Sequence, residues 1–332
     1  MQTLIIASTR PGAGKTAIAA ALGALLGRAP RRALVVKGWA ADPAYDADAA
    51  ALHSLLPDAI ALAPEQAHSP GEAAARAINL AARLRLAAGG EAAVAIVEGA
   101  SGDPTPNMAL AEATDGLVIL VAGVDDGADT AALMYGGRLL GVVINGVPRY
   151  QTHRLDSEIV PALSRAGVPF LGAIPEDRRL VAPSLDLVAE HLGAGFALLP
   201  EQGQRLIDNF LIGGLVLDWG PTYFGSQENT GVIVRGDRPD VQIAALQTDT
   251  TRALVMTKGI SPIEYVHYEA RERGVPVVVS PYDTHETAAR LETLLPKVRF
   301  DHPEKLTRMV ELASSNLDLA AVERAIAQPA TG

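Results

Sequence analysis

A short glycine-rich segment near the amino terminus carries the residues best suited to phosphate chemistry. An apolar run, Leu4 to Ala7, is followed by Ser-Thr-Arg-Pro-Gly-Ala-Gly-Lys-Thr at positions 8–16 and then by an alanine-rich stretch of helical length. Strand, glycine-rich turn, Gly-Lys-Thr and helix is the order of a nucleotide phosphate loop, because the amides at a helix N-terminus favour negative charge. The segment predicts a phosphate site; a turn that merely packs well is the alternative.

Each residue type in this segment has a role in such a site. Gly12 and Gly14 would let the backbone approach the phosphates. Lys15 would reach the β- and γ-phosphates, and Thr16 would offer its hydroxyl to Mg²⁺. The first glycine of the common pattern is absent, since threonine takes its place. The residues expected to contact nucleotide here are Thr9, Arg10, Gly12, Ala13, Gly14, Lys15 and Thr16.

A second lysine and an acidic residue end two further apolar runs. Lys37 follows Ala33 to Val36, and Glu98 follows Ala93 to Val97. The carboxyl ends of parallel strands line one crevice, so both side chains should face the phosphate loop. Lysine is scarce in a chain with 28 basic residues, which favours a function for Lys37 over an idle surface position.

Carboxylates near this crevice could hold a cation. Glu98 is a natural Mg²⁺ ligand, direct or through water, with an exposed loop glutamate as the alternative. Asp48 starts a helical stretch and is either an N-terminal acid stabilised by the helix dipole or a second metal ligand. Asp46 competes with Asp48 for either role.

The elements around these residues indicate an α/β fold. Nearly continuous apolar runs alternate with segments of helical length and spacing, which predicts a mainly parallel sheet with helices on both faces. The further strands expected in the first two hundred residues are 117–121, 141–144 and 169–173. The expected helices are 16–27, 48–56, 71–88, 129–139, 155–166 and 184–192.

The pattern loosens around Gly193 to Gln204, which predicts a domain boundary there. We expect one domain over residues 1–199 and a second, smaller α/β domain with a helical tail over 205–332. The second domain should contain strands at 231–234, 253–256 and 275–279, and helices at 239–246, 262–273 and 285–295. Residues 306–327 should form the helical tail.

Composition excludes several classes of protein. The chain has 332 residues, of which 48% are hydrophobic, so it contains ample material for a core and is not disordered. It has no cysteine, which excludes thiol nucleophiles and cysteine-based metal sites. A net charge of −10 argues against nucleic acid or an anionic membrane as the main partner. With no export signal and no spanning run, we expect a cytoplasmic location.

These motifs, in this order, resemble the dethiobiotin synthetase family of P-loop proteins. The same fold group includes cobyrinic acid a,c-diamide synthase and the amino-terminal region of long phosphotransacetylases. The resemblance runs through the phosphate loop, Lys37, the segment 48–52, Ser69-Pro70, the segments 97–100 and 141–145, and Leu-Gly-Ala-Ile-Pro-Glu-Asp at 171–177.

The resemblance implies roles for individual residues. Thr16, Asp48 and Glu98 would hold Mg²⁺, and Lys15 and Lys37 would contact the phosphate or the transferred group as catalytic residues. The adenine of ATP would lie between Asn145 and the region of Pro175 and Glu176.

The sequence departs from the family at two substrate-contacting segments. The family's Gly-Thr-Asp at the start of the phosphate loop is Ser-Thr-Arg at 8–10, and its Lys-Pro-x-x-Ser-Gly is Lys-Gly-Trp-Ala-Ala-Asp at 37–42. These departures argue against biotin synthesis.

The second domain resembles the DRTGG domain. Gly-Asp-Arg-Pro-Asp-Val-Gln stands at 236–242, and Thr-Lys-Gly at 257–259 places a lysine where the family has a glycine. These motifs and Thr284 each follow a predicted strand, so they suggest either a crevice for a small ligand or partner, or ordinary turn caps. The residues expected in such a regulatory site are Asp237, Arg238, Thr257, Lys258, Gly259 and Thr284.

Three functions fit these features. We expect an Mg-ATP-binding protein with slow or partner-dependent ATPase activity and a regulatory carboxy-terminal domain, acting on a partner such as a phosphotransacetylase. The alternative is an ATP-dependent ligase that activates a carboxylate or carbamate, and a scaffold in which nucleotide only stabilises a dimer is the third. The resemblance also implies a homodimer.

Overall fold

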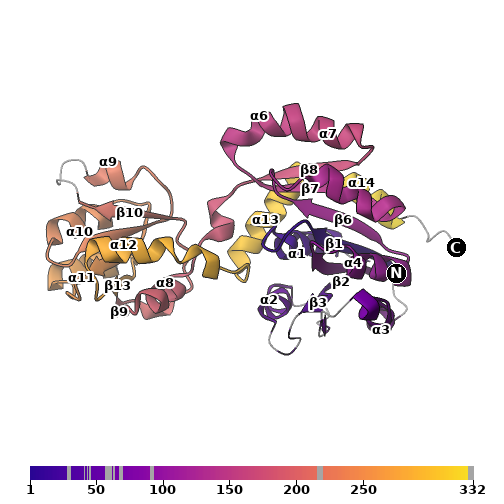
Figure 1. Ribbon diagram of the computed structural model, residues 1–332. Coiled ribbons are helices and arrows are strands. Elements are labelled where there is room, and N and C mark those ends of the chain that lie inside the picture. The colour runs from indigo at the N-terminus through magenta and orange to yellow at the C-terminus, as the bar shows by residue number, and fades with distance from the viewer. Residues whose placement is uncertain are drawn as a thin grey trace. The chain divides into compact units, whose positions relative to one another are not determined.

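A computed structural model describes residues 1–27, 31–40, 42, 44, 46–56, 62, 64–66, 70–89, 93–214 and 220–327. Ser69, part of the resemblance noted above, lies outside the described residues. The chain divides into two compact units, one formed by Met1–Asp177 with Phe300–Gly332 and the other by Arg178–Arg299 (Figure 1). The first is called the nucleotide unit, after the predicted phosphate loop, and the second the DRTGG unit, after the resemblance of its motifs.

The nucleotide unit is built on six parallel strands in the order β2-β5-β1-β6-β7-β8. The central strand β1 therefore has β5 on one side and β6 on the other. The strands are β1 (Gln2–Ser8), β2 (Arg32–Lys37), β5 (Ala93–Ser101), β6 (Leu117–Ala122), β7 (Leu139–Val147) and β8 (Phe170–Pro175), with a small separate pair β3 (Trp39–Ala40) and β4 (Glu65–Gln66).

Helices cover both faces of this sheet. One face packs on α3, α4, α5 and α7 in a core that includes Ile5, Val97, Leu80 and Leu110, and α1 and α13 contact each other as part of the same unit (Figure 1). The helical segments are α1 (Lys15–Leu26), α2 (Ala47–Leu55), α3 (Pro70–Ala88), α4 (Thr105–Thr114), α5 (Ala128–Ala132), η1 (Leu133–Arg138), η2 (Arg149–Gln151), α6 (Thr152–Arg154), η3 (Leu155–Ile159), α7 (Val160–Arg165), α13 (Pro303–Asn316) and α14 (Leu319–Ala327).

The carboxy-terminal tail completes the nucleotide unit. Leu317 bridges Gly172 of the edge strand β8, and the amide of Asp318 donates to the carbonyl of Leu171. Gly172 has a φ of 133°, and a Cβ there would lie 2.0 Å from the carbonyl oxygen of Asn316. Only glycine permits this close approach of two backbones.

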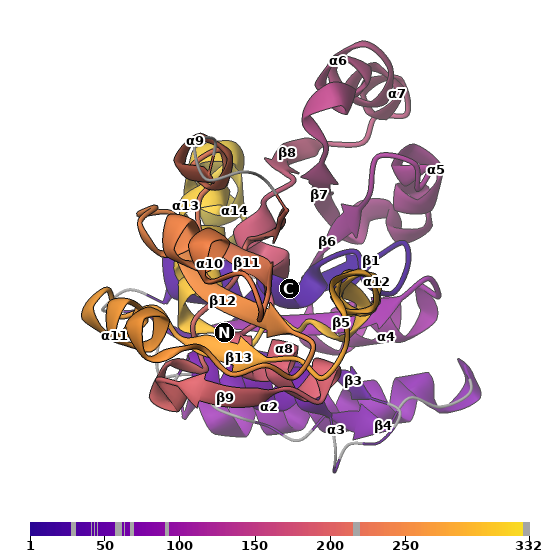
Figure 2. The ribbon, with the colours of Figure 1, turned by 90° about the vertical axis from the view of Figure 1, so that its left-hand side faces the viewer.

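The DRTGG unit has a five-stranded sheet in the order β10-β11-β12-β13-β9, with β9 antiparallel to its neighbour (Figure 2). Helices α10 and α11 pack on one face and α8 and α12 on the other. The elements are η4 (Arg178–Val181), α8 (Leu185–Leu192), β9 (Gly195–Leu198), η5 (Pro200–Gln202), β10 (Asn209–Gly213), α9 (Gly220–Phe224), β11 (Thr230–Arg235), α10 (Pro239–Leu246), β12 (Thr251–Thr257), α11 (Glu264–Glu272), β13 (Val277–Val279), α12 (Thr284–Glu292) and η7 (Leu295–Lys297).

These units differ from the predicted domains, 1–199 and 205–332, in two ways. Residues 178–199 belong to the DRTGG unit, because α8 buries Leu185 and Val188 against its core and β9 is its edge strand. Residues 300–332 belong to the nucleotide unit, because α13 contacts α1 and β8. The segment 193–204, which its glycines made look like a linker, contains the strand β9.

The predicted fold class is confirmed. Both sheets are mainly parallel with helices on both faces, and most of the predicted strands and helices are present with small shifts at their ends. The helical tail expected at 306–327 is divided into α13 and α14, because Leu317 is extended and bridges Gly172. The expected helix at 155–166 contains a π-helical turn over Leu155–Ile159, and the one at 129–139 changes to a 3₁₀ helix at Leu133. Among the described residues, no helix combines the length and the apolar character needed to span a membrane.

Candidate functional site

The phosphate loop joins the central strand β1 to helix α1. Gly12 and Gly14 have φ angles of 75° and 95°, a left-handed conformation that glycine adopts at little cost. Gly14 is the N-cap of α1, and no side chain caps the amides that follow it. Its missing Cβ would lie 2.1 Å from the side-chain nitrogen of Asn145, whereas a Cβ at Gly12 would meet nothing within 4 Å.

Lys15 points into the unit rather than into solvent. It is 8% exposed, and its ammonium donates to the hydroxyl oxygens of Ser8 and Ser101, with the Ser8 distance at 3.2 Å. Burial lowers the pKa of Lys15, although the nearby Glu98 carboxyl acts in the opposite direction. A buried ammonium that donates to neutral hydroxyls is well placed for an anionic ligand.

Register places the second lysine and the predicted metal ligand on adjacent strands. Lys37 of β2 lies opposite Glu98 of β5. The Lys37 ammonium also pairs with Asp46 at 3.0 Å and with Asp48 at 2.6 Å. Burial alone would lower the pKa of Lys37, but the carboxylates of Glu98, Asp48 and Asp46 outweigh burial and raise it.

Glu98 is the most deeply buried acid of this cluster. It is 3% exposed, it accepts a hydrogen bond from Thr16, and its Oε2 has no hydrogen-bond partner. Burial raises the pKa of this carboxyl even though Lys37 and Lys15 act to lower it. A carboxylate oxygen that is buried without a partner is costly, so this atom is suited to a cation or a metal-bound water.

Asp46 and Asp48 at the start of α2 have different contacts. Asp46 is the N-cap, and its carboxylate accepts from the amides of Asp48 and Ala49. Asp48 pairs with Lys37. In the part of the chain that the structure describes, no three His, Cys, Asp or Glu side chains gather as a ready-made metal site. Mg²⁺ does not need one, since it is usually bound through one or two protein oxygens, phosphates and water.

Asn145 contacts the phosphate loop itself. Its side-chain amide donates to the carbonyl of Ala13 at 2.9 Å, across 132 positions of sequence. The structure thus gives Asn145 a role in fixing the loop, beside the predicted one at the adenine. Of the other two residues predicted there, Pro175 ends β8, and the amide of Glu176 donates to the carbonyl of Val147.

Asp126 is a site residue that the sequence did not reveal. Its carboxylate accepts from the Thr9 hydroxyl at 2.6 Å, from the Arg10 guanidinium at 3.0 Å and from the Gly123 amide at 2.7 Å. Burial alone would raise the pKa of Asp126, but these three donors outweigh burial and lower it. The sequence suggests a helix-capping acid here; the actual contact depends on β6 lying next to β1.

The predicted residues of the DRTGG unit lie at the carboxyl ends of β11, β12 and β13. Asp237 pairs with Arg235 at 2.6 Å and with Lys258 at 3.2 Å, and these partners hold the pKa of its carboxyl below the ordinary range. The hydroxyls of Thr257 and Thr284 lie 3.1 Å apart. The ends of the three strands therefore meet as expected.

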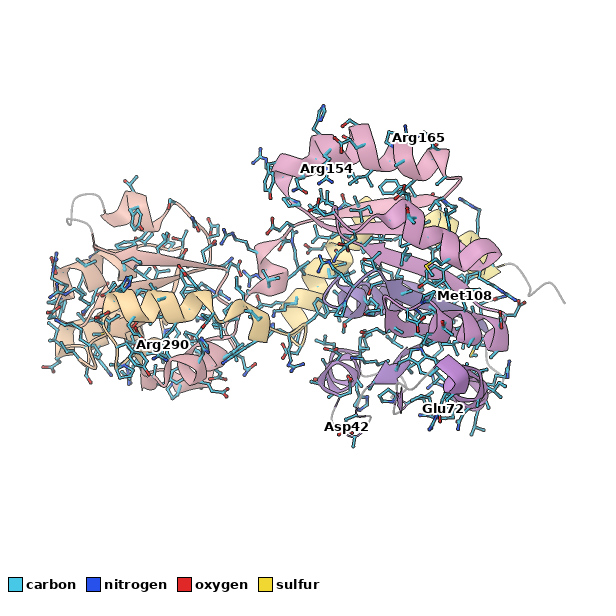
Figure 3. The ribbon with its side chains drawn as sticks, viewed as in Figure 1. Asp42, Glu72, Met108, Arg154, Arg165 and Arg290 are labelled. Atoms are coloured by element: carbon cyan, nitrogen blue, oxygen red, sulfur yellow. The ribbon has the colours of Figure 1, made fainter. Side chains whose placement is uncertain are left out.

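Lys258 has a backbone conformation that normally favours glycine. Its φ is 71°, and its amide donates to the carbonyl of Tyr282 at 2.6 Å, while the amide of Gly259 donates to the carbonyl of Ser280. Arg290 of α12, labelled in Figure 3, stacks 3.9 Å from the centre of the Tyr282 ring. This hydrogen bonding holds the 257–259 turn against the end of β13.

Arg238 does not join the other predicted residues of this unit through a hydrogen bond or ion pair of its own. Its guanidinium pairs with Asp240 at 2.8 Å. The sequence did not single out three residues that contact this group, namely Arg235, Asp240 and Tyr282. Of these, only Arg235 has a recognisable signal in the sequence, its position at the end of a strand.

Comparison with known families agrees with this geometry. Residues 2–184 match the AAA domain family AAA_26, which is more than half of the chain, and residues 187–294 match the DRTGG domain. The chain belongs to this AAA domain family and carries a DRTGG domain. The two matched ranges meet near the boundary between the two units at Arg178. The predicted DRTGG domain is confirmed.

Curated relatives of this AAA–DRTGG chain are phosphate acetyltransferases. The enzyme of Deinococcus radiodurans is 29% identical over 365 residues, covering 96% of this chain and 50% of that protein. The enzyme of Pseudomonas putida is 27% identical over 248 residues, covering 67% of this chain and 35% of that protein. The chain thus spans half or less of these relatives, and the predicted relation to the amino-terminal part of long phosphotransacetylases is confirmed.

Solved structures similar to parts of the chain include an ATP complex of a McdA variant from Cyanothece, with 20% identity, a TM-score of 0.38 and coverage of 54% of this chain and 85% of that one. MinD of Aquifex aeolicus has 15% identity, a TM-score of 0.38 and coverage of 55% and 85%. The CBS and DRTGG domains of a Clostridium perfringens pyrophosphatase, complexed with diadenosine tetraphosphate, have 17% identity, a TM-score of 0.32 and coverage of 38% and 53%.

Proposed function

We propose that the nucleotide unit binds Mg-ATP and hydrolyses it slowly or only with a partner, and that the DRTGG unit is regulatory. The observation that carries this proposal is the buried ammonium of Lys15, which is hydrogen-bonded to the two neutral hydroxyls of Ser8 and Ser101 at the start of α1. A polyphosphate would give the Lys15 ammonium an anionic hydrogen-bond partner. The backbone amides after Gly14, which no side chain caps, would donate to the same phosphate oxygens.

Each residue of the site has a role in this proposal. Lys15 would bind the β- and γ-phosphates, and Thr16 and Glu98 would hold Mg²⁺, with Asp48 at the edge of the cluster. When bound, Mg²⁺ would neutralise charge on the β- and γ-phosphates. Thr9 and Arg10 would be oriented by Asp126, so that the loop keeps its shape when ATP leaves.

Regulation is proposed for the DRTGG unit because its polar strand ends form one group of paired side chains. Asp237, Arg235 and Lys258 are all exposed to solvent and satisfied by one another. A small ligand or partner could exchange with these pairs. Because the chain resembles half of phosphate acetyltransferases, we propose that the regulated activity is of that kind.

A ligase that activates a carboxylate or carbamate is the second candidate. The observation that favours it is Lys37 of β2, whose ammonium pairs with the carboxylates of Asp46 and Asp48 and lies near that of Glu98 on the neighbouring strand β5. Lys37 would then contact the group that receives the phosphoryl. Phosphate release measured with and without diaminopelargonic acid and bicarbonate separates the two candidates: turnover that depends on these substrates favours the ligase.

The phosphate site is tested by Lys15→Ala with Lys297→Ala, an exposed lysine of the DRTGG unit, as the matched control. We expect calorimetric titration with Mg-ATP to show binding for the native protein and for Lys297→Ala, and at least about a hundredfold weaker binding for Lys15→Ala, since charge-assisted bonds to phosphate are each worth about 1.5–3 kcal/mol. Equal ATP affinity in all three proteins would refute the site.

A homodimer is also proposed, on the family resemblance. Light scattering at micromolar concentration, with and without Mg-ATP, tests it. A monomer under both conditions would contradict the dimer without affecting the phosphate site.

A further inference from the structure

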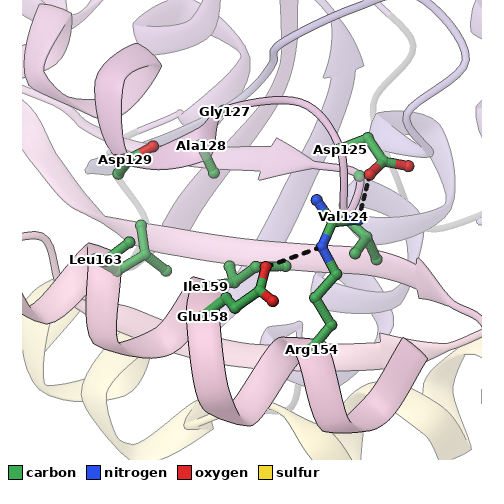
Figure 4. A pocket seen from close by; sticks show the side chains of 11 residues that line it. Val124, Asp125, Gly127, Ala128, Asp129, Arg154, Glu158, Ile159 and Leu163 are labelled. Atoms are coloured by element: carbon green, nitrogen blue, oxygen red, sulfur yellow. Dashed lines mark hydrogen bonds and ion pairs between the residues drawn. The ribbon is translucent and has the colours of Figure 1, made fainter.

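A pocket of about 310 Å³ lies in the nucleotide unit between the loop that follows β6 and the helical segment from α6 to α7 (Figure 4). This volume is at the lower end of the ~300–1,000 Å³ that is typical of small-molecule sites. Its lining includes Asp125, Asp129, Arg154, Glu158, Ile159 and Ala162.

The helical wall of this pocket is irregular. Leu155–Ile159 form a π-helical turn between α6 and α7. Pro161 lies just beyond this turn and has no amide hydrogen, so it cannot donate to the carbonyl four residues before it. Single π-helical turns occur often at functional sites, because they widen a helix and re-aim its side chains. Here the turn contributes Glu158 and Ile159 to the pocket.

The pocket combines an apolar floor with a charged rim. Leu163 and Ala128 are buried, and Ile159 packs partly on the same core. Figure 4 shows Arg154 between Asp125 and Glu158, and its guanidinium forms ion pairs with both. The charged lining consists of three carboxylates and one guanidinium, so the pocket has net negative charge.

This arrangement selects the charge of a ligand. The Arg154 guanidinium is already shared by two carboxylates, so an incoming carboxylate would have to displace them and would also face Asp129. An ammonium would instead meet Asp129 and the exposed carboxylates of Asp125 and Glu158, whose side chains are 72% and 67% exposed. An attached aliphatic chain would bury against the floor.

We propose that this pocket is a binding site for a small primary ammonium with a short aliphatic chain. The ammonium lies at Asp129 and Glu158, and the chain lies over Ile159, Ala162 and Leu163. The pocket is separate from the phosphate loop. Asp126, which stands in sequence between the lining residues Asp125 and Gly127, accepts hydrogen bonds from Thr9 and Arg10 of that loop. Asp126 itself does not line the pocket.

The experiment uses n-pentylammonium as the probe, with pentanoate and 1-pentanol as ligands of the same length but different charge. Saturation-transfer difference NMR on the full chain without nucleotide measures binding, so the outcome does not depend on the proposed function. We expect pentylammonium to bind, pentanoate not to bind and pentanol to bind more weakly than pentylammonium.

Two variants place the probe. Ala162→Phe fills the pocket and should abolish binding, whereas Ser164→Phe, on the exposed side of the same helix, should leave it unchanged. The double variant Asp129→Asn with Glu158→Gln keeps the shape of the pocket and should weaken pentylammonium at least about tenfold while leaving pentanol unaffected. Thermal melting confirms that each variant is folded.

Three results would each overturn the proposal: no binding of pentylammonium to the native protein, equal or tighter binding of pentanoate, or binding that survives Ala162→Phe. The charge variants remain decisive if Ala162→Phe does not fold, because unchanged affinity in the double variant also contradicts an ammonium site.

Discussion

Replacing Gly14 by alanine tests the geometry of the phosphate loop against a matched position two residues earlier. Both Gly12 and Gly14 are left-handed, so alanine at either position is strained by about 1–2 kcal/mol. Only at Gly14 would the new Cβ collide, at 2.1 Å from the side-chain nitrogen of Asn145. Asn145 must then move and give up its hydrogen bond to the Ala13 carbonyl, a further loss of about 1 kcal/mol.

We therefore expect Gly12→Ala to lower the free energy of unfolding of the nucleotide unit by about 1–2 kcal/mol and Gly14→Ala by about 2–3 kcal/mol. Urea denaturation followed by tryptophan fluorescence measures this in a Trp219→Phe background, where the buried Trp39 of the nucleotide unit is the remaining tryptophan. The proposed ATP affinity should fall more in Gly14→Ala, because the displaced loop carries the amides and the lysine that we propose bind the phosphates.

A double-mutant cycle with Asn145→Ala isolates the collision. The double variant Gly14→Ala with Asn145→Ala should be less destabilised than the sum of the single variants by about 1 kcal/mol, because the second change removes the group that the first one strikes. Equal losses for the two glycine variants, or additive losses in the cycle, would refute the role of Asn145 in holding the loop.

Three further predictions concern charged side chains of the nucleotide unit. Glu98→Gln should raise the free energy of unfolding of the ligand-free protein near neutral pH, because burial raises the pKa of this carboxyl above its ordinary 4.5 and so makes the ionised form unfavourable in the folded state. The gain should vanish below pH 4.5, where the carboxyl is protonated in both states, and the proposed Mg-ATP binding should weaken. A lower stability than that of the native protein at neutral pH would contradict this reasoning. Lys305 of α13 is 1% exposed and burial lowers its pKa from 10.5 to about 8, so the unfolded chain binds more protons between these values. The free energy of unfolding should therefore increase by up to about 3 kcal/mol as the pH rises through that range, and Lys305→Met should abolish the increase. Urea denaturation at several pH values measures this, and the same pH dependence in both proteins would contradict it. Asp126→Asn should weaken the proposed Mg-ATP binding several-fold. It should also remove a contribution to the free energy of unfolding that the native protein loses as the pH falls below the ordinary aspartate pKa of 3.8. Unchanged nucleotide affinity would contradict a role of Asp126 in shaping the phosphate loop.

Local features of the site could be predicted from the sequence, because they depend on neighbours along the chain. The phosphate loop requires glycine at 12 and 14 and lysine at 15, and the structure places these residues at the start of α1 as expected. The pairing of Lys37 with Glu98 also follows from parallel strands, and their side chains lie in one cluster with Lys15. Lys37 ends its strand as predicted, whereas β5 continues past Glu98 to Ser101.

The remaining contacts depend on strand order, which alternation of strands and helices does not specify. Ser101 reaches Lys15 because β5 lies next to β1, and Asp126 reaches Thr9 because β6 lies on the other side of β1. These pairs are 86 and 117 positions apart in sequence. No local pattern distinguishes Asp126 from an ordinary helix-capping acid.

The unit boundaries escaped prediction for a similar reason. The periodicity of residues 306–327 indicates a helix with an apolar face but does not say which core that face covers. The glycines at 193 and 195 suggest a linker, yet Gly193 caps the end of α8 and Gly195 begins the edge strand β9. Packing partners, rather than local propensity, decided both cases.

The return of the chain to the nucleotide unit determines the order in which that unit can mature. On the ribosome, the phosphate loop is made within the first twenty residues, but α13, which packs on α1, follows only after the whole of Arg178–Arg299. Until Leu317 has paired with Gly172, the edge of β8 is open. A fragment that ends near residue 199 would lack α13 and Leu317, so α1 and the edge of β8 would stay uncovered. A chain that joins Asp177 directly to Phe300 would keep both contacts.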